Sequence, residues 1–211
     1  MLKSYTTTLS KKFMDQSKVL IIGLSGTNGS GKDTVGEILQ DNYSFCFISV
    51  TDLLRQEAQK RHLSVDRHVL REISAEWRRL DGLGVLVDRA YEDFKSKQQD
   101  YKGLVISSLR NPGEADRIHQ LNGLVIWIDA DPKVRYRRVQ DNKNLRNRFE
   151  EDNKSFEQFL ADEASEMHSS GDNATLNMAA VKKLADIKIN NNFDTITAFS
   201  EYLDNKLAKY L

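Results

Sequence analysis

The 211-residue chain predicts an α/β fold in three layers (α/β/α), with a five-stranded parallel sheet between helices. Four short runs are continuously apolar and rich in Val and Ile, as strands are when helices cover both faces of a sheet. A fifth run, DIKIN, is more polar and gives a weaker signal. Helical patterns separate the runs, so strand and helix alternate along the chain. The five expected strands span residues 19–24, 45–49, 104–107, 124–128 and 186–190.

The turns after the third and fourth runs carry helix-start signals. Asn111, Pro112 and Glu114 match an N-cap, a first-turn proline and a reciprocal acidic residue at the third helical position. Asp131 and Pro132 repeat the cap and the proline. Because α/β sheets bind ligands at the carboxyl ends of their strands, we expect the functional site at these turns.

The chain is expected to form one domain preceded by a short extension. Residues 1–18 lack the apolar core of a signal peptide, and we expect an N-terminal extension there. Residues 19–211 contain no repeat and no low-complexity linker, which favours a single domain. Two long helical excursions interrupt its strands, one at about 52–97 and one at about 135–176.

Composition narrows the class of protein. Apolar residues make up 39% and charged residues 29% of the chain, which is ordinary for a soluble domain. Lys and Arg total 31, as do Asp and Glu, so the net charge gives no indication of a nucleic-acid or membrane partner. No run approaches membrane-spanning length, and the single cysteine excludes an internal disulfide. We expect a cytoplasmic monomer or homodimer.

The stretch GTNGSGKDT has the glycines and the lysine of a phosphate-binding loop. It follows the first strand and precedes a helix, which is the context that this motif requires. Glycines let successive backbone N–H groups face inward, the helix start adds a positive dipole end, and the lysine reaches the β- and γ-phosphates. The alternative is a glycine-rich turn with an incidental lysine. The residues expected to contact the phosphates of ATP are Gly26, Thr27, Asn28, Gly29, Ser30, Gly31, Lys32, Asp33 and Thr34.

On this loop and three later stretches, the chain resembles the nucleoside-monophosphate kinase and dephospho-CoA kinase group of small P-loop phosphotransferases. The resemblance covers nearly everything from Val19 to Leu211. It is similar in particular to a branch of uncharacterised archaeal nucleotide kinases, and its GKD loop is similar to that of phage deoxynucleoside-monophosphate kinases. The resemblance implies a P-loop NTPase fold, a helical acceptor-binding insert, an arginine-bearing lid, and transfer of phosphate from ATP with Mg²⁺ to a small nucleotide-like acceptor.

Two stretches imply the acceptor site. ISVTDLLRQEA resembles the adenylate kinase segment in which an Asp and an Arg meet the acceptor phosphate, which implies roles for Asp52 and Arg55. ISSLRNPGEAD resembles the segment whose arginine grips the acceptor, here Arg110. We place Arg78, in the first excursion, in the same pocket. Arginine suits this work because its rigid fork binds phosphate bidentately and keeps its charge. The alternative for each arginine is a surface pair with a nearby Glu, and for Asp52 it is helix capping.

The third stretch, RYRRVQDNKNLRNRF, resembles the lid that closes over the transferring phosphoryl group. The resemblance implies catalytic roles for Lys32 and Asp52, and for the lid arginines Arg138, Arg146 and Arg148. A solvated charged face explains any single lid arginine equally well.

The loop has Asp33 where relatives usually carry the Ser or Thr that holds magnesium. The strand-end Asp that helps to hold magnesium in adenylate kinases is Ser107 here. We therefore expect Asp33 to bind Mg²⁺ directly or through water, since this ion favours hard oxygens. The alternative is a helix cap. Asn190 and Asn191 occupy the place where relatives contact adenine, although a plain polar turn fits as well.

The leading hypothesis is therefore a kinase for a (deoxy)nucleoside monophosphate. Dephospho-CoA kinase is the alternative within the same class. A regulator that binds ATP without transferring phosphate, or a slow ATPase, is the alternative from another class.

Overall fold

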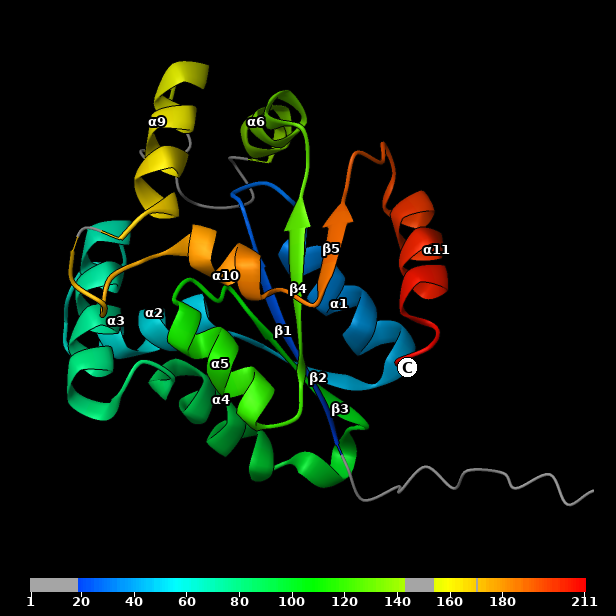
Figure 1. Cartoon of the computed structure of the whole chain (residues 1–211), viewed down its shortest axis with the longest axis horizontal. Helices are drawn as coiled ribbons and strands as arrows, with labels where there is room; N and C mark the ends of the chain where they lie inside the picture. The colour runs from blue at the N-terminus through cyan, green and yellow to red at the C-terminus, as the bar shows by residue number, and fades with distance from the viewer. Residues whose placement is uncertain (1–18, 143–153, 170) are drawn as a thin grey trace, which may run out of the picture.

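The computed structural model describes residues 19–142, 154–169 and 171–211 (Figure 1). In this part of the chain five strands form one parallel sheet in the order β2-β3-β1-β4-β5. This confirms the five expected strands within two residues at each end. Their bounds are β1 Leu20–Gly26, β2 Phe45–Ser49, β3 Gly103–Ser107, β4 Leu124–Asp129 and β5 Ile187–Asn190.

Strand β1 is the centre of the sheet and sets the position of the site. It pairs with β3 on one side, where Ile22 lies opposite Val105, and with β4 on the other, where Leu24 lies opposite Ile126. All five strands run parallel to one another, and the arrows of β4 and β5 point toward the top of Figure 1. The loop that follows β1 therefore leaves the sheet between the carboxyl ends of β3 and β4.

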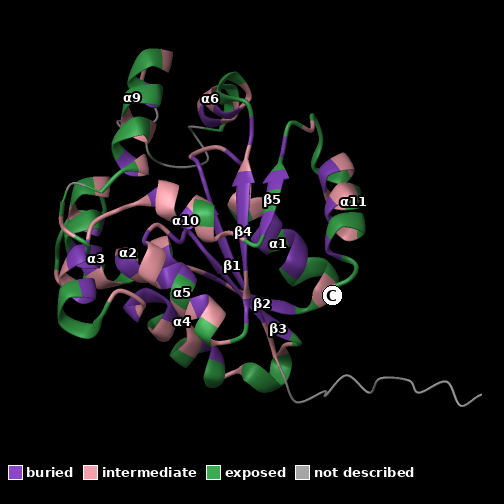
Figure 2. Cartoon of the chain, viewed as in Figure 1, coloured by how far each residue is buried: buried purple, intermediate pink, exposed green. Residues whose placement is uncertain are grey.

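Helices cover both faces of the sheet and confirm the three-layer α/β/α architecture. On one face lie α1 (Lys32–Tyr43), which packs against β1, β2 and β3, and α11 (Ile196–Leu207), whose apolar side joins the same core cluster as β4 and β5. On the other face lie α4 (Val85–Lys95), α5 (Pro112–Gln120) and α10 (Met178–Leu184). The sheet between them is almost entirely buried (Figure 2). The four continuous apolar runs form β1 to β4, which helices cover on both faces, whereas the edge strand β5 buries Ile187 and Ile189 and exposes Lys188 and Asn190.

The remaining helices stand around the carboxyl ends of the strands. After β2 the chain forms α2 (Val50–Lys60) and α3 (Arg67–Asp81), and after β4 it forms α6 (Pro132–Asp141) and α9 (Phe156–Met167). In Figure 1, α6 and α9 lie beyond the upper ends of the strands. A short 3₁₀ turn at Gln98–Asp100 precedes β3. Both α2 and α4 pack against β2 and β3, so part of the first excursion belongs to the helix layer on that face of the sheet.

The helix-start signals predicted after the third and fourth strands are confirmed at the starts of α5 and α6. Asn111 and Glu114 form the reciprocal cap of α5, with Pro112 in its first turn, and Asp131 accepts a hydrogen bond from the Lys133 amide at the start of α6.

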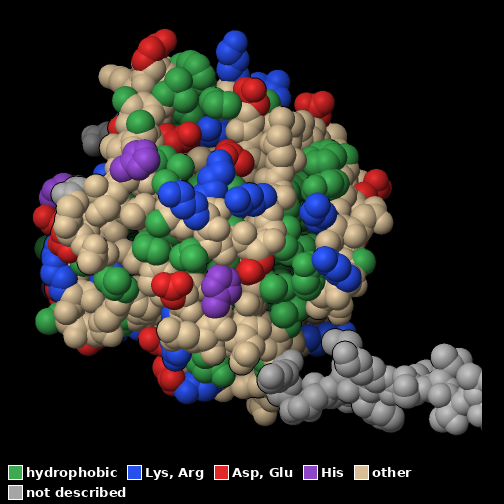
Figure 3. All heavy atoms as spheres, in the orientation of Figure 1, with side chains coloured by type: hydrophobic (Ala, Val, Ile, Leu, Met, Phe, Trp, Pro, Cys, Tyr) green, Lys and Arg blue, Asp and Glu red, His purple; other side chains and the backbone are tan. Residues whose placement is uncertain are grey.

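Both signs of charge lie on the face seen in Figure 3, where several Lys and Arg side chains gather near α10. Among the described residues, no helix has the length and apolar character that a membrane crossing requires.

Candidate active site

The loop between β1 and α1 has a backbone that two glycines permit. Gly29 and Gly31 have φ angles of 78° and 88°, in the left-handed region that L side chains rarely adopt. A Cβ on Gly29 would lie 2.6 Å from the carbonyl oxygen of Arg135, and one on Gly31 would lie 2.5 Å from Nδ2 of Asn191. The two glycines therefore allow the loop to adopt this conformation and to pack closely against Arg135 and Asn191.

Neighbouring strand ends hold this loop in place. The Thr27 hydroxyl donates to Oδ1 of Asp129 over 2.9 Å, and Asn191 Nδ2 donates to the Ser30 carbonyl over 2.9 Å. Burial raises the pKa of Asp129, but hydrogen bonds from Thr27 and the Ala130 amide, with Arg135 and Lys182 nearby, bring the net pKa below its ordinary value. Asp129 is thus a charged anchor at the end of β4.

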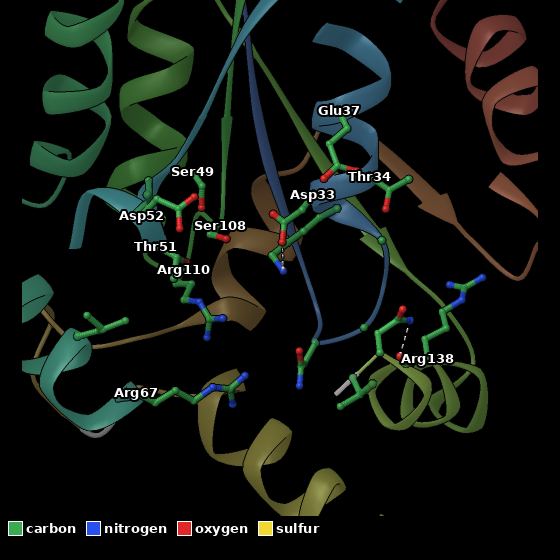
Figure 4. Close-up of a pocket in the computed structure, with 18 of the residues that line it drawn as sticks. Asp33, Thr34, Glu37, Ser49, Thr51, Asp52, Arg67, Ser108, Arg110 and Arg138 are labelled. Atoms are coloured by element: carbon green, nitrogen blue, oxygen red, sulfur yellow. Dashed lines mark hydrogen bonds and ion pairs between the residues drawn. The ribbon is translucent and has the colours of Figure 1, made fainter. Parts of the chain in front are cut away.

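Lys32 and Asp33 begin α1 and lie at the mouth of the loop. The Lys32 Nζ atom is 3.7 Å from Asp33 Oδ2, and the Ser107 hydroxyl donates to Asp33 Oδ1 over 2.8 Å. The Asp33 side chain is 55% exposed and points toward the open space in Figure 4. The loop carboxylate therefore lies directly beside the strand end where the resembling adenylate kinases have an Asp.

A single cleft of about 1370 Å³ extends from this loop across the ends of the strands. Lys32 and Asp33 lie in its wall on the loop side, and Arg67 and Arg110 lie on the far side. Figure 4 shows Arg67 and Arg110 directed into the space between these two sides. The cleft thus joins a phosphate-binding loop to a group of arginines, as two substrates that react with each other would require.

Three arginines on the far side converge on one buried carboxylate, that of Glu166 on α9. Arg110 Nη1 lies 2.6 Å from Glu166 Oε2, Arg67 Nη1 lies 3.4 Å from Oε1, and Arg71 also pairs with Oε1. Of these residues, sequence reasoning identified Arg110 alone. The spacing of Arg67 and Arg71 in RHVLR places both on one face of a helix, which is the signal that could have found them.

Asp52 and Arg55 lie in the first turns of α2 and both line the cleft. Arg55 Nη1 donates to Asp52 Oδ1 over 2.6 Å, an i,i+3 pair with the Asp52 side chain 59% exposed. The pair holds the Arg55 guanidinium near the end of β2. Their roles toward an acceptor stay predictions.

Arg78 lies in the wall of the cleft, with its guanidinium engaged in the core. It donates from Nε and Nη2 to Oε1 of Glu114, and from Nη1 to the Ala174 carbonyl, over distances of 2.7–3.1 Å. The Arg78 and Glu114 side chains are 2% and 0% exposed. This arrangement joins α3 to α5 and to the segment before α10.

The lid arginines are divided between described and undescribed residues. Arg138 on α6 donates to the carbonyls of Asn191 (3.0 Å) and Phe193 (2.7 Å), and Figure 4 shows it across the cleft from Arg110. Arg146 and Arg148 lie outside the described residues. Asn191 is buried and directs its side chain to the loop, whereas Asn190 is exposed.

Comparisons with known proteins agree with this geometry. A family model described as "AAA domain" matches residues 22–159. The chain is 30% identical over 118 residues to a cytidylate kinase from Archaeoglobus fulgidus, covering 56% of this chain and 59% of that protein. It is 29% identical over 126 residues to a cytidylate kinase from Methanococcoides burtonii, covering 58% and 62%. The chain thus spans about three fifths of the length of these curated relatives.

Solved structures add a likeness of fold. The chain superposes on shikimate kinase from Acinetobacter baumannii in complex with shikimate with a TM-score of 0.53 and 16% identity, covering 92% of this chain and 96% of that one. At this identity the likeness concerns the fold alone. Because the family model matches more than half of its length, the chain belongs to the AAA-domain family, and the superposition shows that it has an α/β P-loop fold.

Proposed function

We propose that this chain is an ATP-dependent kinase that phosphorylates a nucleoside monophosphate, with CMP as the first acceptor to test. The observation that carries the proposal is the continuous cleft between Lys32 and Arg110. Phosphoryl transfer needs donor and acceptor in line, with the charge on their oxygens neutralised, and it needs little covalent help. The names of the two cytidylate kinases to which the chain is similar support the choice of CMP.

The donor would be bound on the loop side of the cleft. Backbone amides of residues 26–34 and the Lys32 ammonium suit a triphosphate, because together they supply donors and a positive charge. Phe193 and the 68% exposed Ile196 line the same end of the cleft and offer an apolar surface for a nucleotide base. Asn191 supports the loop beneath, and its neighbour Asn190 stays a weaker candidate for contact with adenine.

The residues on the loop side fit Mg²⁺. Asp33 presents carboxylate oxygens to the cleft, and Ser107 holds one of them. Among the described residues no three His, Cys, Asp or Glu side chains form a metal cage. Mg²⁺ that arrives with ATP does not require one, since phosphates and waters fill most of its coordination sites. When bound, the ion would neutralise charge on the transferring group, and Asp33 would hold it directly or through water.

The acceptor would be bound on the arginine side. Arg110 lies three residues beyond the end of β3, and Arg55 pairs with Asp52 at the start of α2, so both line the cleft beside the carboxyl ends of β2 and β3. Their fixed charges would orient the acceptor phosphate and offset its repulsion from ATP. Arg138 donates hydrogen bonds to two carbonyls of the loop after β5. It would therefore hold that loop in position at the end of the cleft where the donor binds.

A coupled ADP-release assay tests the proposal. ATP turnover with Mg²⁺ is measured alone and with CMP, dCMP, UMP, AMP, dephospho-CoA or shikimate. We expect a nucleoside monophosphate to raise turnover well above the rate without acceptor, and Lys32→Ala to lower the stimulated rate by about 10²–10³. Lys95→Ala, an exposed lysine on α4 away from the cleft, serves as the control and should keep the wild-type rate.

Each other outcome excludes the proposal in a defined way. Stimulation by dephospho-CoA alone would assign the chain to the other kinase class. ATP turnover that ignores every acceptor would indicate a slow ATPase or a regulator. Stimulated turnover that survives Lys32→Ala would show that a contaminating kinase produces the signal.

A further inference from the structure

The carboxylate of Glu166 occupies the centre of the arginine group on the acceptor side. Its side chain is only 7% exposed, and Arg67, Arg71 and Arg110 all pair with it. The arginines come from α3 and from the turn after β3, whereas Glu166 comes from the last turn of α9. Segments that lie 56 to 99 residues apart in the chain therefore meet at one anion.

The Glu166 carboxylate has only two oxygens for the three guanidinium groups that surround it. Arg110 binds Oε2, but Arg67 and Arg71 must share Oε1, and the Arg67 contact is long at 3.4 Å. A phosphate monoester offers three terminal oxygens in a tetrahedral arrangement, one for each guanidinium. The geometry of the three arginines thus suits a tetrahedral anion better than the planar group that fills it.

The charges point the same way. Three guanidinium groups and one carboxylate leave these four side chains with a net charge of +2 (3 − 1). Burial raises the pKa of Glu166, but Arg110, Arg67 and Arg71 outweigh burial and hold this pKa at about 2, so Glu166 is ionised at neutral pH. A phosphate monoester dianion brings twice the charge of the carboxylate to the same arginines.

We propose that Glu166 is an intramolecular occupant of the acceptor's anion site, and that the phosphate dianion of the acceptor displaces it from the arginines. Glu166 thereby makes the site select phosphate monoesters over carboxylates. A phosphate monoester brings more negative charge and one more oxygen than the carboxylate that it replaces, whereas a carboxylate ligand brings neither. This inference rests on the proposed function in one respect, namely that the arginine side of the cleft receives the acceptor.

Titration calorimetry with inorganic phosphate tests the displacement without catalysis. Wild type, Glu166→Gln, and the double variant Glu166→Gln/Arg71→Ala are compared at pH 7.5 and constant ionic strength. Glu163→Gln is the matched control, because Glu163 lies one turn earlier on α9 and pairs with Arg135 outside the group. Phosphate binding at the β1–α1 loop adds a background common to wild type, Glu166→Gln and the double variant, because Glu166 and Arg71 have no partner in that loop, whereas Glu163 pairs with Arg135, which also contacts the Asn28 carbonyl.

We expect Glu166→Gln to bind phosphate at least about tenfold more tightly than wild type, a difference of about 1.4 kcal/mol. The double variant should lose this gain, and Glu163→Gln should stay within about twofold of wild type, under 0.5 kcal/mol. Phosphate should also raise the melting temperature of Glu166→Gln more than that of wild type. If Glu166→Gln folds poorly, Glu166→Asp, whose carboxylate is one methylene shorter, should show a smaller gain of the same sign.

Equal or weaker phosphate binding by folded Glu166→Gln or Glu166→Asp would overturn the proposal. So would an equal gain in Glu163→Gln, which would indicate a general effect of loosening α9, or a gain that survives Arg71→Ala. The titration can succeed where the kinase assay fails, and the kinase assay can succeed where the titration fails. The two hypotheses therefore fail separately.

Discussion

Replacing Arg78 with Met removes a guanidinium from the core and leaves the Glu114 carboxylate behind. The two side chains are 2% and 0% exposed, so water cannot take over the lost hydrogen bonds without opening the structure. Arg78 Nε and Nη2 lie 3.1 and 2.7 Å from Glu114 Oε1, and Nη1 lies 2.9 Å from the Ala174 carbonyl. Met replaces the apolar stem of the arginine but ends about two atoms earlier, so the substitution removes the charge, the donors and the buried volume of the guanidinium.

The expected loss is set by what Glu114 retains. Its Oε2 atom still accepts from the amides of Arg110 (2.7 Å) and Asn111 (3.1 Å), whereas Oε1 loses both arginine donors. Breaking a buried pair by removing one partner costs about 3–5 kcal/mol. For a chain of this length, at roughly 2–4 °C per kcal/mol, the melting temperature should fall by about 6–20 °C.

Urea unfolding followed by circular dichroism measures this loss. Arg79→Ala is the control, because its neighbouring pair with Asp172 is 56% and 42% exposed and should contribute less than about 1 kcal/mol. The double variant Arg78→Met/Glu114→Gln should recover part of the stability, since it removes the unpaired buried charge. If Arg78→Met is as stable as wild type while the acceptor KM rises, the structural interpretation of Arg78 is wrong and its predicted contact with the acceptor stands.

Three further predictions concern the site. Glu166 has a pKa of about 2 in the folded chain against an ordinary 4.5, so its contribution to stability is complete above about pH 4.5 and is lost as pH falls toward 2. The difference in unfolding free energy between wild type and Glu166→Gln should be constant from pH 8 to about pH 5 and should shrink below about pH 4.5; a difference that stays constant to pH 3 would contradict this. Calorimetry should show that Mg²⁺ tightens ATP binding by at least about tenfold in wild type and by much less in Asp33→Asn; an equal effect of Mg²⁺ in both would count against metal binding by Asp33. Gly31→Ala should lose ATP binding, because its Cβ would meet Asn191 Nδ2 at 2.5 Å. Gly171→Ala has a similar φ, and no atom of the described residues lies within 4 Å of its Cβ, so it should keep ATP binding at a cost of about 1–2 kcal/mol in stability. Unchanged ATP affinity in Gly31→Ala would show that the loop tolerates displacement.

Local sequence patterns predicted most of the fold. The apolar runs at 19–24 and 124–128 identified buried strands because a strand covered on both faces has no polar side to show. The cap formed by Asn111 and Glu114 could be predicted from four consecutive residues, because it depends only on nearby backbone amides. The phosphate-binding loop was predicted for the same reason: its glycines and its lysine act within a single turn.

The acceptor side of the cleft depended on contacts between distant segments. Sequence reasoning assigned Arg78 and Arg110 the same role, yet one guanidinium lies in the core beside Glu114 and the other faces the cleft. The sequence around Arg78 gives no sign that its guanidinium is buried, because burial is decided by the helices that pack over it. The meeting of Arg67 with Glu166 was likewise invisible, since 99 residues separate them and no local pattern pairs charges at that distance. The sequence by itself determined the sheet and its phosphate-binding loop, whereas the packing of α3 and α9 beside the strand ends decided which arginines face the cleft.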